Sequence, residues 1–154
     1  MDVRVLTEAF DPQAECAAFA ACRFDAGALV SFVGLCRETG ADGTVQALHL
    51  QQYAGFTQRE MQRMAQEVAT RFCCPDLLVL HRVGEILPGE AIVLVAALSA
   101  HRAEAFEAVR ILMDYLKTDA PLWKKEIGPQ GVRWIEPRPQ DHAQRAAASG
   151  KMAG

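Results

Sequence analysis

Short apolar runs bounded by turn residues recur along the chain and predict its β-strands. The alternating segment DVRVLT at residues 2–7 is the first, since a half-buried strand points every second side chain to one face. GALVSFVGLCR at 27–37 is apolar and glycine-bounded, and VQALHLQQY at 45–53 follows it after the turn-rich ETGADGT. We expect these two segments to pair as a hairpin. The remaining predicted strands lie at 77–84, 91–98 and 131–138.

Three segments carry apolar side chains at helical spacing. The first, at 12–24, follows Asp11, which suits an N-cap, and has proline in its first turn. The second follows TQRE at 57–60, which has the spacing of a capping box. The third is an amphipathic helix at 102–118, and Pro121 ends it.

The predicted elements follow the order β-α-β-β-α-β-β-α-β. Because short turns join neighbouring strands, the sequence predicts an α+β fold with a mixed, largely antiparallel sheet rather than a doubly wound one. A chain of 154 residues fits a single domain, which we place at 1–138. Residues 139–154 hold few large apolar side chains and are predicted to be a flexible tail with at most a short helix near HAQRAAA.

The charge balance limits the classes of partner. A formal net charge of −3 and a pI near 5.8 argue against nucleic acid or an anionic membrane surface. No apolar run approaches the roughly 18 residues of a membrane span. The N-terminal MDVRVLTEAF lacks the basic start and apolar core of a signal peptide, so we expect a cytoplasmic protein.

Five cysteines, without the spacing of a disulfide framework, are predicted to be small buried side chains. Cys73 and Cys74 have no second Cys or His pair at ligand spacing, so no metal site is expected. The sequence contains no glycine-rich phosphate loop and no GxSxG motif, and its carboxylates are scattered. The chemistry must therefore be sought among the basic residues.

A basic cluster occupies AHRAEAFEAVRILMDYLKTDAPLWKKE at residues 100–126. Lys117 lies at the border of the apolar face of the predicted helix, so its stem can pack on the core while its ammonium points beside the helix. Lys124 and Lys125 follow in a predicted turn, which the preceding Leu-Trp pair would pin to the body. Taken singly, Lys117 also suits the helix dipole, and adjacent lysines also suit a solvated turn.

His101 and Arg102 begin the same helix, where free backbone N–H groups favour anions and arginine offers a planar fork to phosphate oxygens. Arg37, at the end of a predicted strand, is a further cation that can converge with them. The other His-Arg dipeptide lies inside a predicted strand, and we interpret its His81 as satisfied locally. Together the cations predict a pocket for an anionic, phosphorylated small molecule.

Five segments taken together resemble the large, catalytic subunit of molybdopterin synthase. They are VSFVGLCR, HRVGEILPGE, SAHRAEAF, MDYLKTDAPLWKKE and GVRWIE, and the similarity spans residues 2–138. The most specific piece is LKTDAPLWKKE. The resemblance implies an α/β hammerhead fold with an antiparallel subdomain, which agrees with the α+β interpretation.

The resemblance also implies a sulfurtransferase of molybdenum cofactor biosynthesis. Enzymes of that family convert cyclic pyranopterin monophosphate into molybdopterin by building a dithiolene, with no metal or other cofactor at this step. The sulfur arrives as a thiocarboxylate on the C-terminal Gly-Gly of a small ubiquitin-like sulfur-carrier subunit. Two large subunits form a central homodimer and bind one carrier at each end, which gives a heterotetramer.

Residue roles carry over from the matching motifs. Lys117 matches the family's essential lysine, and it would stabilise the charge that develops as sulfur attacks or transfer a proton, with Lys124 as the second catalytic lysine. A lysine acts as a base only where burial or cationic neighbours lower its pKa from about 10.4. The substrate-binding positions that the resemblance implies are Leu35, Cys36, Arg37, His101, Arg102, Lys117, Lys124, Lys125, Glu126 and Arg138.

Two segments depart from the family pattern. RETG at 37–40 stands where many relatives carry an RNH-like run, and LQQY at 50–53 stands where relatives often have Glu and a His or Tyr. These departures concern loop 38–44 and the strand beside it, not the lysines. Two other functions stay open at this point: a non-catalytic scaffold that binds a ubiquitin-like Gly-Gly tail, and an unrelated phosphate-binding α+β enzyme that uses Lys117 alone.

Overall fold

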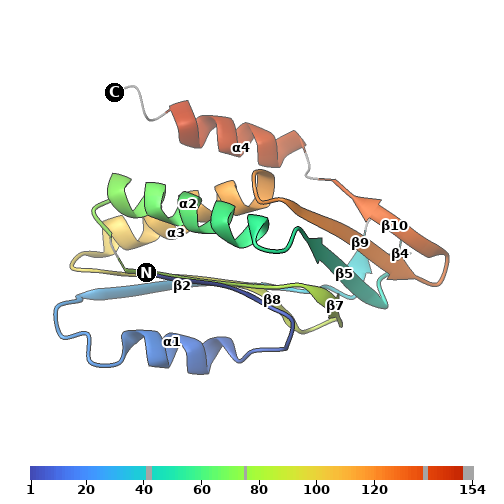
Figure 1. The fold of residues 1–154 in the computed structure, drawn as a ribbon, viewed down its shortest axis with the longest axis horizontal. Helices are drawn as coiled ribbons and strands as arrows, with labels where there is room; N and C mark the ends of the chain where they lie inside the picture. The colour runs from blue at the N-terminus through green and yellow to red at the C-terminus, as the bar shows by residue number, and fades with distance from the viewer. Residues whose placement is uncertain (41–42, 75, 137–138, 151–154) are drawn as a thin grey trace.

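The computed structural model describes residues 1–40, 43–74, 76–136 and 139–150, which form two main sheets and the helices that pack on them (Figure 1). The first sheet has the order β1-β6-β8-β2, with strands Asp2–Leu6, Asp76–Arg82, Ala91–Ser99 and Ala28–Leu35. In this sheet β1 runs parallel to β6, and the other neighbours are antiparallel. The predicted mixed, largely antiparallel α+β fold is confirmed.

Helices cover both faces of this sheet, with α1 on one side and α2 and α3 on the other (Figure 1). Their bounds are Pro12–Ala20 for α1, Phe56–Arg71 for α2 and Arg102–Thr118 for α3. Successive strand residues point to opposite faces. In β6, Leu78 and Leu80 therefore belong to the core beneath α1, whereas Leu77 and Val79 belong to the core beneath α2 and α3.

The second sheet is fully antiparallel and forms a subdomain with its own small core. Its order is β10-β9-β5-β7, with strands Gly131–Ile135, Leu122–Gly128, Ala47–Gln52 and Gly84–Ile86. The short hairpin of β3 (Thr39–Gly40) and β4 (Gly43–Thr44) precedes β5. The core of this subdomain is Cys36, Leu48, Leu50, Val83 and Ile86.

The predicted hairpin between 27–37 and 45–53 is wrong. Strand β2 pairs with β8 at the edge of the first sheet, whereas β5 pairs with β7 and β9 in the second. Burial explains the difference, because Leu48 and Leu50 lose water exposure only by packing with Ile86 in the separate core of the second sheet.

The segment after Pro121, predicted as a turn, is strand β9. It lies inside the second sheet, paired with β5 on one side and β10 on the other. A two-residue connection between Gly128 and Gly131 reverses the chain, and Gly131 has φ of +117°, which glycine adopts without strain. The two lysines predicted in a turn therefore have the alternating directions of strand residues.

Helices α1 and α3 begin where the sequence predicts, and α3 also ends there, at Thr118. Asp11 caps α1 by accepting hydrogen bonds from the backbone N–H groups of Gln13 (2.8 Å) and Ala14 (3.3 Å). The C-terminal segment holds helix α4 (Pro139–Gly150), longer than the short helix suggested by the sequence, and it packs on α3. No helix of the described part of the chain is long and apolar enough to cross a membrane.

The predicted capping box of α2 is wrong. The N-cap is Gly55, without a side-chain cap, and Thr57 lies buried in the first turn instead of pairing with Glu60. The Thr57 hydroxyl accepts a hydrogen bond from the backbone N–H of Tyr53 (3.1 Å) and donates one to the carbonyl of Pro121 (3.0 Å). Thr57 thus ties α2 to the connection between α3 and β9.

The second His-Arg dipeptide, at the end of β6, is structural, as predicted for His81. The buried His81 ring lies with Nδ1 2.9 Å from the Arg82 carbonyl, and burial lowers the pKa of this imidazole to about 4. The Arg82 guanidinium donates to the Glu90 carboxylate (2.8 Å) and to the Glu85 carbonyl (3.1 Å). The dipeptide joins β6 to the β7 segment of the second sheet.

Thr57→Val should destabilise the protein by about 1–3 kcal/mol, because it removes the buried Thr57 hydroxyl and leaves the part-buried Pro121 carbonyl and Tyr53 N–H without their partner. Urea unfolding measures the change. Thr70→Val is the matched control, since that exposed hydroxyl bonds to Gln66 of its own helix, donating to its carbonyl and accepting from its side-chain amide. Equal losses in the two variants would contradict this account of Thr57.

Stability should fall on acidification from pH 6.5 toward pH 4. The unfolded chain protonates His81 near its ordinary pKa of 6.5, whereas the folded chain does so only near 4, so acid favours the unfolded state in this window. The difference corresponds to about 3 kcal/mol at pH 4. His81→Asn should flatten the pH dependence of the free energy of unfolding, measured by urea unfolding at several pH values. His142→Asn, on exposed α4, should leave that dependence unchanged. Parallel curves for His81→Asn and the parent protein would rule the assignment out.

Candidate active site

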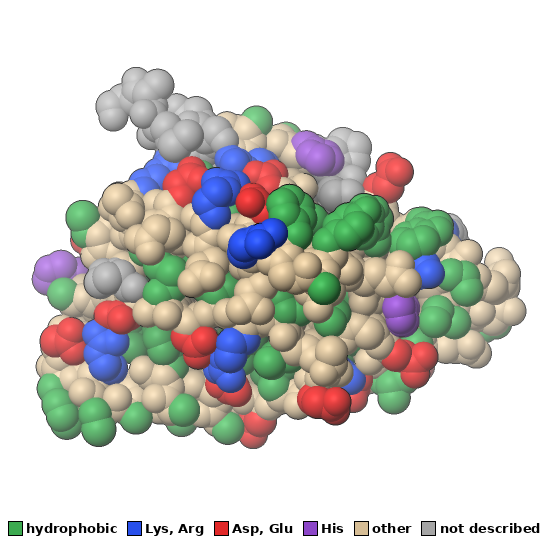
Figure 2. Space-filling view, viewed as in Figure 1, with side chains coloured by type: hydrophobic (Ala, Val, Ile, Leu, Met, Phe, Trp, Pro, Cys, Tyr) green, Lys and Arg blue, Asp and Glu red, His purple; other side chains and the backbone are tan. Residues whose placement is uncertain are grey.

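A wide groove of about 2210 Å³ lies where the two sheets meet. The end of β2, the strands β5, β9 and β10, the last turn of α3 and one residue of α4 line it. Hydrophobic side chains gather beside the β9–β10 hairpin and below α4, next to Lys and Arg side chains (Figure 2). The sequence-predicted site residues that line the groove are Leu35, Arg37, Lys117, Lys124 and Glu126.

Two lysines enter this groove from different elements. Lys117 is exposed in the last turn of α3, and Lys124 is half-buried on β9, opposite Leu50 of β5. Burial lowers the pKa of the Lys124 ammonium, and the positive charges of Arg37 and Lys117 lower that pKa further. The Glu126 carboxylate opposes this shift by stabilising the protonated form. The groove thus brings together three predicted cations.

Glu126 is held within the groove wall by contacts from two other strands. Its carboxylate accepts a hydrogen bond from the Arg133 guanidinium of β10 at 3.1 Å, and the two residues are paired across the strands. Gly40 of β3 packs against the same carboxylate, since a Cβ there would lie 2.6 Å from Oε2. The loop that departs from the family pattern therefore contacts a predicted site residue.

Strand alternation separates Lys125 from the other two lysines. Leu122, Lys124 and Glu126 share one face of β9, whereas Lys125 lies 4.5 Å from the ring centroid of Trp134 in a cation–π contact. Lys125 does not line the groove. The sequence analysis placed Lys124 and Lys125 together in a turn, whereas in strand β9 the two side chains point to opposite faces.

Cys36 is buried beneath the groove rather than in its surface. Its thiol faces the Ile86 carbonyl at 3.7 Å and the Arg37 carbonyl at 3.9 Å. Burial raises the pKa of this thiol, although the positive charge of Lys124 opposes the shift. A protonated, enclosed thiol agrees with a packing role for Cys36.

His101 and Arg102 lie at the opposite end of α3 from Lys117. Fifteen residues separate Arg102 from Lys117, and at 1.5 Å per residue this is about 22 Å along the helix. Both side chains are exposed, and neither lines the groove. The structure of one chain therefore does not bring them to the lysines, and Arg138, also predicted, lies outside the described residues.

Sequence reasoning missed the aromatic wall of the groove. Tyr53 and Trp123 form an edge-to-face pair with ring centroids 4.4 Å apart, and Trp134 lines the groove from β10. By strand alternation Trp123 shares the face of Lys125 on β9, so the spacing in LWKKE gave no signal for its place at the groove. In the described ranges, no group of three or more His, Cys, Asp or Glu side chains could hold a metal ion.

Lys124→Met should raise the thermal stability at pH 7. A lowered pKa in the folded state means that folding disfavours the charged ammonium, so an uncharged side chain of similar length removes that cost. We expect a melting temperature higher by about 2–5 °C in calorimetry. Lys125→Met is the matched control and should show no gain; a lower melting temperature for Lys124→Met would contradict the assignment.

Comparisons with known proteins cover most of the chain. The family model described as MoaE protein matches residues 5–119. A molybdopterin synthase catalytic subunit from Caulobacter vibrioides is 50% identical over 141 residues, which cover 92% of this chain and 93% of that protein. A protein of the same name from Mesorhizobium japonicum is 48% identical, with coverage of 90% and 87%.

The solved structures agree with this assignment. The molybdopterin biosynthesis MoaE protein from Burkholderia ambifaria has a TM-score of 0.80 to this structure and 41% sequence identity, covering 97% of this chain and 99% of that one. Fold and sequence thus match over nearly the whole length, and the resemblance seen in the five motifs is confirmed. The chain belongs to the MoaE protein family.

Proposed function

We propose that this protein is the catalytic subunit of a molybdopterin synthase. In this proposal it transfers sulfur from the thiocarboxylated C-terminus of a small ubiquitin-like carrier subunit to cyclic pyranopterin monophosphate. The observation that carries it is the placement of Lys117, Lys124 and Arg37 around one groove in a chain of net charge −3. The pyranopterin is the substrate in this proposal, and the proposal assigns no metal or cofactor to the step.

The charges of the groove suit both reactants. The cyclic phosphate and the thiocarboxylate are anions, and a cleft lined by cations raises their local concentration. Lys117, exposed at the helix end, would stabilise the negative charge that develops as sulfur attacks. The lowered pKa of Lys124 brings its proton exchange closer to neutral pH, so Lys124 is the better candidate for proton transfer.

The aromatic wall suits the tail of the carrier. Tyr53 and Trp123 expose large flat rings at the groove, against which a narrow Gly-Gly tail can pass without steric conflict. The tail would then deliver its thiocarboxylate to the lysines beyond them. Binding of a small ubiquitin-like partner at this wall is part of the proposal.

A homodimer supplies what one chain lacks. His101 and Arg102 lie too far from Lys117 of the same chain to bind the same substrate, so a second copy must provide them if they hold the phosphate. Edge strand β2 supports self-association, because it exposes Leu29, Phe32 and Leu35 at 41%, 42% and 55%. The proposed assembly is a central homodimer with one carrier at each end.

Lys117→Ala should lower turnover by about 10²–10³-fold, as expected for the loss of one charge aimed at the reacting atoms. The assay mixes the protein with thiocarboxylated carrier and cyclic pyranopterin monophosphate and quantifies molybdopterin by the fluorescence of its oxidised derivative. Lys125→Ala, on the opposite face of β9, should retain at least about tenfold more activity than Lys117→Ala. Carrier binding without any product from the parent protein would instead favour the non-catalytic scaffold.

A further inference from the structure

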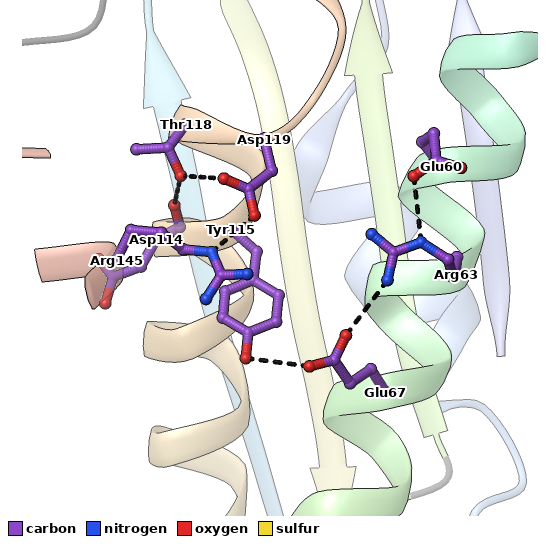
Figure 3. A network of polar contacts seen from close by, with 8 residues as sticks. All are labelled: Glu60, Arg63, Glu67, Asp114, Tyr115, Thr118, Asp119 and Arg145. Atoms are coloured by element: carbon purple, nitrogen blue, oxygen red, sulfur yellow. Dashed lines mark hydrogen bonds and ion pairs between the residues drawn. The ribbon is translucent and has the colours of Figure 1, made fainter. Parts of the chain in front are cut away.

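Arg145 of helix α4 contacts the C-terminal end of α3 (Figure 3). The Nε of Arg145 lies 2.6 Å from a carboxylate oxygen of Asp119, and its guanidinium stacks 3.7 Å from the ring centroid of Tyr115. The side chain of Arg145 is 23% exposed, so these contacts hold it largely out of water. Gln144, its neighbour in α4, lines the groove.

Asp119 places a negative charge in the groove close to Lys117 along the chain. It is the C-cap of α3, lies two residues after Lys117 and lines the same groove. A carboxylate at a helix C-terminus faces the negative end of the helix dipole, so it is stabilised only by a nearby cation or hydrogen-bond donors. Here Thr118 donates its hydroxyl to Asp119 at 2.8 Å, and Arg145 supplies the cation.

The Tyr115 ring, against which Arg145 stacks, is held in place from α2. Tyr115 is fully buried, and its hydroxyl donates to the Glu67 carboxylate of α2 at 3.2 Å, which also accepts a bond from Arg63 (Figure 3). Tyr115 belongs to α3 and its hydroxyl bonds to α2, so both helices fix the ring on which the Arg145 guanidinium stacks. This arrangement sets the direction from which Arg145 reaches Asp119.

We propose that Arg145 is a positioning residue that holds the Asp119 carboxylate and neutralises its charge beside the anion-binding lysines. Without Arg145, the charge of Asp119 in the groove would be opposed only through its weaker interaction with Arg63, and it would repel an anionic substrate and compete for the Lys117 ammonium. Arg145 acts through Asp119 and touches no reacting atom. The inference rests on the proposed function, because it assumes an anionic substrate.

The test measures steady-state kinetics of the full chain with thiocarboxylated carrier and cyclic pyranopterin monophosphate. Arg145→Ala should raise the KM for the pyranopterin by about fivefold with a smaller change in kcat, since a charge at the groove edge acts through screened Coulomb interaction. Adding Asp119→Asn should return KM to within about twofold of the parent, because it removes the charge that Arg145 neutralised. Arg145→Lys should lie close to the parent.

The rescue separates an electrostatic from a purely structural role. If Arg145 only docks α4, the double variant Arg145→Ala with Asp119→Asn will bind substrate as poorly as Arg145→Ala or worse. Arg4→Ala is the matched control, since it removes an ion pair of the same 2.6 Å length, to Glu15, away from the groove, and should leave KM unchanged. Circular dichroism melting of each variant checks that it is folded at the assay temperature.

The outcomes also separate this inference from the proposed function. An active parent with an unchanged KM in Arg145→Ala, or a raised KM without rescue by Asp119→Asn, overturns the role of Arg145 and leaves the synthase proposal standing. A parent that neither binds the pyranopterin nor forms product overturns the synthase proposal, and the inference falls with it. A raised KM with rescue supports both.

Discussion

The connection between α3 and β9 is the constraint on which the site depends. The last turn of α3 carries Lys117, and only a few residues later the chain enters the middle of the second sheet with Lys124. Because α3 packs on the first sheet and β9 belongs to the second, this connection fixes the two sheets relative to each other at the groove. Thr57 holds it from α2 through the Pro121 carbonyl.

Around this connection, carboxylates are matched with arginines from other elements. Glu126 of β9 is paired with Arg133 of β10, and Asp119 at the end of α3 is paired with Arg145 of α4. Each pairing compensates a carboxylate that lines the groove together with Lys117 and Lys124. The neutral, buried His81 adds no charge at pH 7.

The two-sheet architecture gives the groove walls of different character. The first sheet is covered by helices on both faces, and it lines the groove with the second half of its edge strand β2 and with His81, Ile92 and Val93 of β6 and β8. The second sheet is smaller, and it presents the aromatic side chains Tyr53, Trp123 and Trp134. Charged side chains of the groove thus adjoin an aromatic wall, an arrangement typical of sites that bind a small molecule.

The sequence by itself determined most of the helices and strands and the family to which the chain belongs. Periodicity placed α3 at 102–118 because seventeen residues in one amphipathic pattern leave few alternatives, and the motif around Lys117 identified the family. Only the tertiary structure decided which strands pair, since 45–53 suits either sheet until burial selects one. It also decided that Lys125 lies against Trp134 and that Arg145 reaches Asp119, because such contacts join residues whose spacing along the chain carries no signal.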